Sequence, residues 1–291
     1  YKFVNISRQA IWKYQRREAY NQDLILRCIS IMKKLRIRHK QMGCRSMYDA
    51  SKTAPPVGRD RFIEIGMANG YRLKHRRNKR KTTWAQTTDI YPNLIAGMTL
   101  TKINQVWQSD IFYHHENGKD YYGITIIDVY SRRLLALHLS RSLRAEENVK
   151  ALQSAVKSRL GQKIEGCIFH SDRGSQYFSN IQKEEIFHHG LKISMCKIPQ
   201  ENAYAERVQE TIQHYYLCDE NLEGKPLKRV SAQILKKYNE ERPHSGIDMM
   251  TPAAFEKHVE NLPKRHRPKC LIFKWDHGLS TKSQLPTKRK K

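Results

Sequence analysis

Three acidic residues stand at positions where a carboxylate could do chemistry. Asp110 lies within a run of apolar and aromatic residues that predicts a β-strand, where an unpaired charge would cost several kcal/mol. Asp172 directly follows a short apolar strand, and Glu206 comes one turn into a later helix. Because strand ends face the crevice where α/β sheets bind ligands, we expect the three acids to meet at one edge of a sheet. Carboxylate oxygens are the ligands that Mg²⁺ and Mn²⁺ prefer, so the trio predicts a divalent-metal site.

The same trio suggests a reaction. Two divalent ions about 3.5–4 Å apart can activate an attacking oxygen and stabilise a leaving oxygen, which is the chemistry of phosphodiester cleavage. Taken singly, each acid is better explained as a helix cap or a surface charge. The combination of Asp110, Asp172 and Glu206 in this order of elements favours metal-ligating catalytic residues.

The elements that must position these acids follow a mixed α/β pattern. Strands are predicted at 106–114, 121–129 and 133–140, and the first two are joined through Asn117-Gly118, a strong hairpin signal. The pattern continues with a helix at 145–160, a strand at 167–170, a helix at 179–189, a strand at 191–196 and a helix from 202, with Ser179 and Asn202 as N-caps. This order predicts one mixed five-stranded sheet with helices, in an α/β domain over residues 105–220.

The region before this domain is predicted to be helical and basic. Short helices separated by turns suggest a helix-turn-helix-like DNA-binding region over residues 1–73, although an ordinary basic helical bundle would give the same pattern. The predicted helices are 7–19, 22–40, 45–51 and 59–69, with Ser7 as the first N-cap. Residues 74–104 are predicted to be a basic linker. Its expected phosphate contacts are Arg76, Arg77, Lys79, Arg80 and Lys81.

Two further segments follow the α/β domain. Residues 221–260 are predicted to be helical, with Thr251 as an N-cap and Pro252 at the first helical position. Residues 261–291 form a basic tail.

The charge of the chain is distributed unevenly. Its 291 residues carry 54 Lys and Arg against 28 Asp and Glu, a net charge of +26. Residues 1–100 carry +16 and residues 221–291 carry +10, whereas residues 101–220 are neutral. Basic flanks around a neutral block favour a polyanionic partner. The absence of any run of 18 apolar residues argues against a membrane partner. The six Cys lack C-x-x-C spacing, so a reducing cytoplasm is expected.

Six motifs surround and follow the three acids. They are W-Q-S-D-I at 107–111, I-D-V-Y-S-R at 127–132, H-S-D-R-G-S-Q-Y at 170–177, E-N-A-Y-A-E at 201–206, Y-N-E-E-R-P-H at 238–244 and T-P-A-A-F at 251–255. With S-R-Q-A-I-W at 7–12 and N-G-Y-R-L at 69–73, they make the sequence resemble the DDE transposases of bacterial insertion sequences. This retroviral-integrase-like family has a catalytic core with an RNase H-like fold, and the resemblance covers residues 5–257.

The resemblance implies an RNase H-like mixed five-stranded sheet, with residues 221–260 as the helical C-terminal part of the integrase core. It implies Asp110, Asp172 and Glu206 as the catalytic triad and as ligands of two Mg²⁺ ions, which Mn²⁺ can replace. In the family, water first frees a 3′-OH at a transposon end, and this 3′-OH then attacks a second phosphodiester. The implied substrate is double-stranded DNA, both transposon ends and target, and the implied assembly is a homo-oligomer of at least two copies.

Two features depart from the family pattern. Asp172 and Glu206 are 34 positions apart, slightly closer than usual, and the loop at 196–201 can absorb the difference. Gln213 stands where the family often has Lys or Arg. DNA contacts near the site are expected from Arg173, Gln176, Tyr177, Arg207 and Gln213.

Four other polar residues near the motifs have more ordinary explanations. Asp128 is expected to cap a turn rather than to bind metal. His170 is expected to be a satisfied core histidine, and Glu201 to have a loop role before the Asn202 cap. His244 is expected to serve packing.

Two other functions stay open from the sequence. An RNase H-like nuclease or junction resolvase would hydrolyse DNA without joining it, but it has less use for two basic flanks and a helix-turn-helix. A non-enzymatic repressor derived from a transposase would bind DNA without cutting it, but all three acids are present. The preferred interpretation is a transposase acting on nucleoid DNA in the bacterial cytoplasm. The sequence begins at Tyr1, which fits a truncated chain or one fused to an upstream DNA-binding segment.

Overall fold

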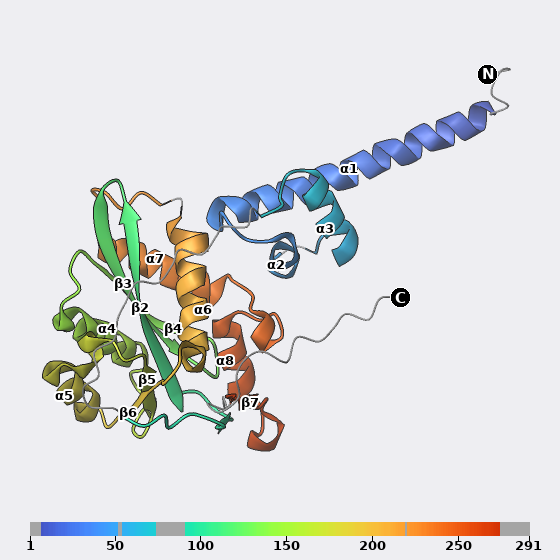
Figure 1. Cartoon of the computed structure of the whole chain (residues 1–291). Coiled ribbons are helices and arrows are strands. Elements are labelled where there is room, and N and C mark those ends of the chain that lie inside the picture. Colours follow the sequence, from blue (N-terminus) through green and yellow to red (C-terminus); the bar gives the residue numbers. More distant parts are fainter. Residues whose placement is uncertain (1–6, 52–53, 74–90, 219, 274–291) are drawn as a thin grey trace, which may run out of the picture.

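The computed structural model describes residues 7–51, 54–73, 91–218 and 220–273, as a helical region beside an α/β body (Figure 1). The helices are α1 (Arg8–Arg38), α2 (Cys44–Asp49), α3 (Arg59–Ala68), α4 (Ala145–Ser158), α5 (Asn180–His188), α6 (Ala203–Thr211), α7 (Leu227–Glu240) and α8 (Pro252–Glu260). The strands are β1 (Thr99–Leu100), β2 (Val106–Glu116), β3 (Lys119–Asp128), β4 (Leu134–Ser140), β5 (Ile168–Ser171), β6 (Lys192–Met195) and β7 (Cys270–Leu271). The end of α6 continues into a π-helical turn, η3 (Ile212–Leu217). No helix in the described ranges is both long and apolar enough to span a membrane.

The N-terminal region is built around one long helix. α1 runs without a break through residues 20 and 21, so the prediction of two helices at 7–19 and 22–40 was wrong. Neither Gly nor Pro occurs between residues 8 and 38, and nothing local therefore stops the helix. Ser7 is the N-cap as predicted, because its Oγ accepts the N–H of Ala10 at 3.1 Å.

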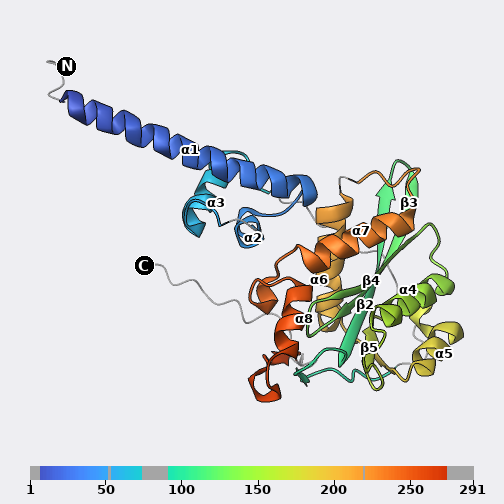
Figure 2. The same ribbon diagram turned by 180° about the vertical axis from the view of Figure 1, so that it is seen from behind.

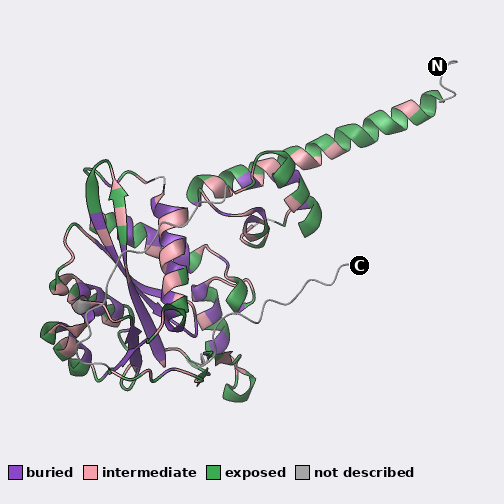
Figure 3. Cartoon of the chain, in the orientation of Figure 1, coloured by how far each residue is buried: buried purple, intermediate pink, exposed green. Residues whose placement is uncertain are grey.

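A small apolar core holds α1, α2 and α3 together. It consists of Cys28, Met32, Met42, Cys44, Met47, Phe62 and Ile65. Residues 8–23 of α1 extend beyond this core and are largely exposed (Figure 3). The other end of α1 contacts the body, where Arg38 Nε and His39 Nε2 lie 2.9 and 3.0 Å from Glu241 Oε2.

A mixed five-stranded sheet forms the body, in the order β4-β3-β2-β5-β6. β2, β3 and β4 are antiparallel neighbours, whereas β5 runs parallel to β2 and β6 parallel to β5. Asn117 and Gly118 form the turn between β2 and β3 with φ angles of 48° and 74°, as the hairpin signal predicts. Three antiparallel strands followed by two parallel ones are the arrangement of an RNase H-like fold, and the predicted fold class is confirmed.

Helices cover both faces of the sheet (Figures 1 and 2). α4 and α5 pack on one face, where Trp107 and Tyr177 are part of the core. α6 and α7 pack on the other face, where Phe112 is part of the core. Side chains alternate along a strand, so Gln108 and Asp110 share the α6 face with Phe112.

The pairing of β2 with β3 requires a glycine opposite Phe112. Gly123 is the cross-strand partner of Phe112. A Cβ atom at position 123 would stand 2.0 Å from Phe112 Cζ, well inside van der Waals contact. The glycine thereby leaves room for the Phe112 ring in the core beneath α6.

Residues 91–104 and 261–273, which the charge pattern assigned to a linker and a tail, belong to the α/β body. Ile95 and Leu100 of the predicted linker are fully buried, and β1 pairs antiparallel with β7 of the predicted tail. Ile272 joins the same core, together with Phe255 of α8. These short apolar stretches pack only because the fold brings them together, so charge alone misplaced residues 91–104 and 261–273. The basic runs at 74–81 and 288–291 lie outside the described residues.

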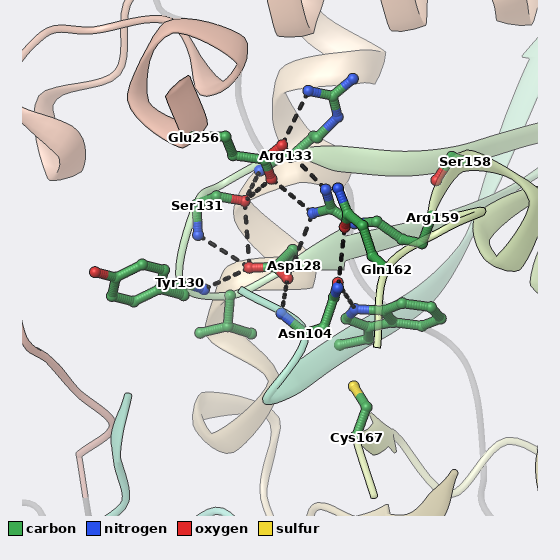
Figure 4. Close-up of polar contacts among 12 residues, drawn as sticks. Asn104, Asp128, Tyr130, Ser131, Arg133, Ser158, Arg159, Gln162, Cys167 and Glu256 are labelled. Carbon is green, nitrogen blue, oxygen red and sulfur yellow. Dashed lines mark hydrogen bonds and ion pairs between the residues drawn. The ribbon is translucent and has the colours of Figure 1, made fainter. Parts of the chain in front are cut away.

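A buried ionic network joins the turn after β3 to α4 and α8 (Figure 4). Asp128 accepts the N–H of Asn104 at 2.6 Å and that of Ser131 at 3.0 Å, which confirms its predicted role as a turn cap. Arg159, at the end of α4, lies 3.5 Å from Asp128 Oδ2 and 2.6 Å from Glu256 Oε1. Burial raises the pKa of Asp128. Burial acts in the same direction on Glu256, but the hydrogen bonds and charge of Arg159 outweigh it and lower the pKa of Glu256.

The substitution Arg159→Met tests this network. It leaves the buried Asp128 without its cationic partner and Glu256 with Arg133 alone, so we expect the free energy of unfolding to fall by about 3 kcal/mol. Urea denaturation measures the change. Lys157→Met, an exposed change on the same helix, is the control and should stay within about 0.5 kcal/mol of the parent. Equal stability of the two variants would contradict the role of the network.

Candidate active site

Asp110 lies on β2 at the point where the neighbouring strand β5 ends. The parallel pairing of these strands aligns Gln108 with His170. Extending this register by two residues brings Asp172, which directly follows Ser171 at the end of β5, near the level of Asp110. Two of the three predicted acids therefore reach one level of the sheet from adjacent segments.

A buried glutamine brings the third acid towards the same place. Gln108 is fully buried on the face of β2 that meets α6. Its Oε1 accepts the N–H groups of Tyr204 and Ala205 at 3.1 and 3.2 Å, and its Nε2 donates to the carbonyl of Glu201 at 3.1 Å. The first-turn N–H groups of a helix have no partner within the helix, and this amide supplies one. Glu206 is the next residue on α6, so its position is tied to β2.

A second amide ties the same turn to β2. Asn202 precedes α6, but its side chain does not cap the helix as predicted. Its Nδ2 instead donates to the carbonyl of Ser109 at 3.0 Å. The reason is that Gln108 already occupies the first-turn N–H groups, which leaves the Asn202 amide for the strand.

The contact between α6 and β2 continues past the acids. Gln213, about two helical turns after Glu206 and hence on the same side, donates from Nε2 to the carbonyl of Tyr113 at 2.7 Å. Tyr113 lies three residues beyond Asp110 on β2. Glu206 lies between these two attachment points, so its backbone is held close to the stretch of β2 that contains Asp110.

Two buried groups near Asp110 and Asp172 experience the charge of these acids. Burial raises the pKa of the Cys196 thiol to about 12, with contributions from the carboxylates of Asp172, Glu201 and Asp110. Burial also raises the pKa of the Tyr177 hydroxyl, again reinforced by Asp172 and Asp110. The negative potential at this strand end favours a bound cation.

The acids are not assembled into a preformed metal site. In the part of the chain that the structure describes, no group of three or more His, Cys, Asp or Glu side chains is arranged to hold a metal ion. Asp110 Oδ1 accepts the N–H of Ile111, and Asp172 Oδ1 accepts the N–H of Gly174, each at 3.0 Å. The backbone register thus brings the acids to one edge, while local hydrogen bonds orient the carboxylates. Their oxygens fit a hard divalent cation in type, and joint coordination requires the side chains to rotate.

The predicted DNA-contacting residues have different outcomes. Arg76, Arg77, Lys79, Arg80 and Lys81 lie outside the described residues. Arg207 is exposed, Gln176 is half-buried, and Arg173 is half-buried with its Nε 3.1 Å from the carbonyl of Cys196. Tyr177 is 1% exposed, so the prediction that it contacts DNA was wrong. Its ring completes the core and its hydroxyl lies 2.8 Å from Ser109 Oγ.

Three polar residues have the ordinary roles expected of them. His170 is a core histidine: it is fully buried, burial lowers its pKa to about 4, and its Nδ1 lies 2.9 Å from Ser194 Oγ, although its Nε2 has no hydrogen-bond partner among the described residues. Glu201 Oε2 accepts the N–H of Lys197 at 2.6 Å and thereby fixes the loop before α6. The His244 ring packs edge-on against Tyr238, with ring centroids 4.7 Å apart.

Sequence reasoning missed Gln108. Its signal was a polar side chain in a strand otherwise buried, next to Trp107, since a buried amide in such a place must find hydrogen-bond partners. The partners themselves lie on α6, about 95 residues later, and no local pattern identifies them.

Comparison with known proteins agrees with this geometry. Residues 101–200 and residues 190–252 each match an Integrase core domain family. The chain is 30% identical over 215 residues to the insertion element IS600 uncharacterized 31 kDa protein of Shigella sonnei, across 71% of this chain and 77% of that protein. It is 28% identical over 198 residues to the transposase for insertion sequence element IS904 of Lactococcus lactis, across 66% of this chain and 75% of that protein. The chain belongs to the integrase-core transposases of bacterial insertion sequences.

This transposase is therefore a DDE-type phosphoryl-transfer enzyme of DNA transposition and integration, and membership of the family entails dependence on divalent metal. It acts on DNA. Among solved structures, the HTLV-2 integrase catalytic core domain in complex with magnesium aligns with a TM-score of 0.43 at 18% identity, over 56% of the transposase and 99% of that chain.

The substitution Gln108→Leu tests the attachment of α6. It leaves the N–H groups of Tyr204 and Ala205 and the carbonyl of Glu201 buried without their partner. We expect the free energy of unfolding to fall by about 1–3 kcal/mol, measured by urea denaturation. Gln153→Leu, on the exposed side of α4, is the matched control. Should both variants unfold at the same urea concentration, the amide does not hold the helix.

Proposed function

We propose that this transposase binds the terminal inverted repeats of its insertion sequence and catalyses Mg²⁺-dependent DNA cleavage and strand transfer at the edge where β5 ends. The observation that carries the proposal is the β2–β5 register, which brings Asp172 near the level of Asp110, with α6 attached to β2 beside them. In this account Asp110, Asp172 and Glu206 are the catalytic residues and the ligands of two Mg²⁺ ions. Mn²⁺ can replace Mg²⁺, because both prefer oxygen ligands.

The bound ions would supply Lewis-acid activation of the attacking oxygen and charge neutralisation at the leaving oxygen. The protein contributes positioning. Gln108 and Asn202 hold the start of α6 on β2, so that Glu206 stays near the two aspartates. Phosphoryl transfer to water or to a DNA 3′-OH needs no side-chain nucleophile, which agrees with a site made of carboxylates.

Positive charge beside the acids suits a DNA backbone. Arg173 directly follows Asp172, and the exposed Arg207 directly follows Glu206. Arginine side chains beside a phosphate fix its position and add affinity that depends on salt, without reading sequence. Gln176, near the same loop, completes the contacts that we propose here.

The proposed substrate is double-stranded DNA, at both transposon ends and at the target. Strand transfer joins an end to a distant phosphodiester, so two ends must be held together and the active assembly is a homo-oligomer of at least two copies. The basic helices of residues 7–73 form the proposed end-reading region, in the manner of a helix-turn-helix.

The substitution Asp110→Asn tests the assignment of the acids. It removes one metal ligand, so cleavage and joining of labelled inverted-repeat DNA in Mg²⁺ should be lost, while binding of the same DNA in a gel-shift assay should persist. Asp120→Asn, an exposed change near the β2–β3 turn, is the control and should retain activity. Chelation of Mg²⁺ by EDTA should stop the parent enzyme in the same way. Strand transfer by Asp110→Asn at near the parent rate would refute the proposal.

The products of the same assay identify the reaction. Joined DNA products support a transposase. Cleavage without joining would instead indicate a nuclease, and binding with neither product would indicate a repressor.

A further inference from the structure

A second feature of the surface lies away from the three acids. A cleft of about 1150 Å³ separates the N-terminal helices from the body. One wall includes Gln41, between α1 and α2, and Arg45, in the first turn of α2. The other wall is formed by α6, η3 and the segment 242–249 after α7. The two walls are held together beside the cleft, where Arg38 and His39 contact Glu241.

The cleft is strongly basic. Its lining includes Arg45, Arg132, Arg207 and Arg242, which come from four different parts of the chain. The acid in the lining is Glu210, and its Oε2 already accepts from Arg207 Nη1 at 3.1 Å. The lining of the cleft therefore carries an excess of positive charge.

Two of these guanidinium groups are held in place by aromatic rings. Arg132 lies 4.0 Å from the centroid of the Tyr204 ring, and Arg242 lies 4.4 Å from that of Tyr215. Such stacking fixes the cation and occupies the ring face. The cleft therefore offers positive charge that is held in position.

A buried histidine experiences the same charge. His244 lines the cleft, and its Nε2 is buried without a hydrogen-bond partner among the described residues. Burial, together with the charges of Arg242 and Arg132, lowers the pKa of His244 to about 3. The potential at this wall disfavours a cation and favours an anion.

Helix α6 connects the cleft to the catalytic edge. Arg207 lines the cleft and directly follows Glu206, so a DNA strand leaving the acids needs only to pass around one helix to enter it. We propose that this cleft binds the phosphodiester backbone of a DNA strand that extends from the catalytic edge. The proposal depends on the proposed function, which supplies DNA as the substrate.

The test changes one charge on each wall. Arg45→Glu alters an exposed residue of α2, and Arg242→Gln removes a charge from the opposite wall; Arg229→Glu, exposed on α7 and outside the cleft, is the control. Affinity for fluorescent DNA is measured by anisotropy over a series of salt concentrations, with a blunt inverted-repeat duplex and with a single strand of equal length. The logarithm of the affinity falls as the logarithm of the salt concentration rises. Each lost phosphate contact should make this slope shallower, by about 0.9 for duplex or about 0.7 for single-stranded DNA.

We expect both cleft variants to bind about tenfold more weakly at low salt with a reduced slope, and the control to match the parent. If affinity is lost for only one of the two DNA forms, that form is the one that the cleft binds. The cleft proposal is overturned if Arg45→Glu behaves like Arg229→Glu, or if Arg45→Glu alone has an effect while Arg242→Gln, shown by urea denaturation to be folded, binds normally.

The outcome is separable from that of the proposed function. Mg²⁺-dependent cleavage by the parent enzyme is measured on the same duplex. If the parent cleaves the duplex and both cleft variants bind like the control, the cleft proposal alone fails. If the parent binds DNA without cleaving it, the proposed function fails whatever the cleft variants do.

Discussion

The parallel pairing of β5 with β2 is the constraint on which the catalytic edge depends. It sets Asp172 at the level of Asp110 although 61 residues separate them in the sequence. The register is fixed by the pairs from Val106↔Ile168 to Gln108↔His170, so a slip of either strand would carry its acid away from the other. The attachment of α6 by Gln108 then adds Glu206 to the same edge.

Two aspartates in neighbouring strands show how one residue type serves stability or function. Asp128 is fully buried, and backbone N–H groups together with Arg159 compensate its charge. Asp110 is 7% exposed and lies beside further carboxylates, whose charges reach Cys196 and Tyr177. The first environment neutralises a carboxylate within the protein, whereas the second concentrates negative charge where a cation can reach it. The same contrast explains why a buried strand aspartate is by itself no evidence of catalysis.

The sequence was informative where the determinant was local. The Asn117-Gly118 turn, the Ser7 cap and the strand that carries Asp110 were all predicted, because each depends on neighbouring residues. Prediction from the sequence failed where contacts between residues far apart in the chain determine the structure. Tyr177 follows a loop rich in polar residues and was expected at the surface. Its ring instead packs in the core, and its hydroxyl contacts Ser109 on β2.

The candidate site shows the same limit. The identities of its three acids came from motif order, and the fold provides the alignment of two of them. The amide of Gln108 was overlooked because its partners lie on an element that only the tertiary structure brings near. The orientation of the carboxylates is set by bonds to Ile111 and Gly174, which the sequence pattern does not specify.

Crystallography of this transposase with an inverted-repeat DNA end and Mn²⁺ tests the central claim most directly, because anomalous scattering locates the ion. The account predicts manganese with oxygens of Asp110, Asp172 and Glu206 in its coordination shell, at distances of about 2.1 Å. Manganese bound elsewhere, or bound at this edge with any of the three carboxylates turned away in the presence of DNA, would contradict it.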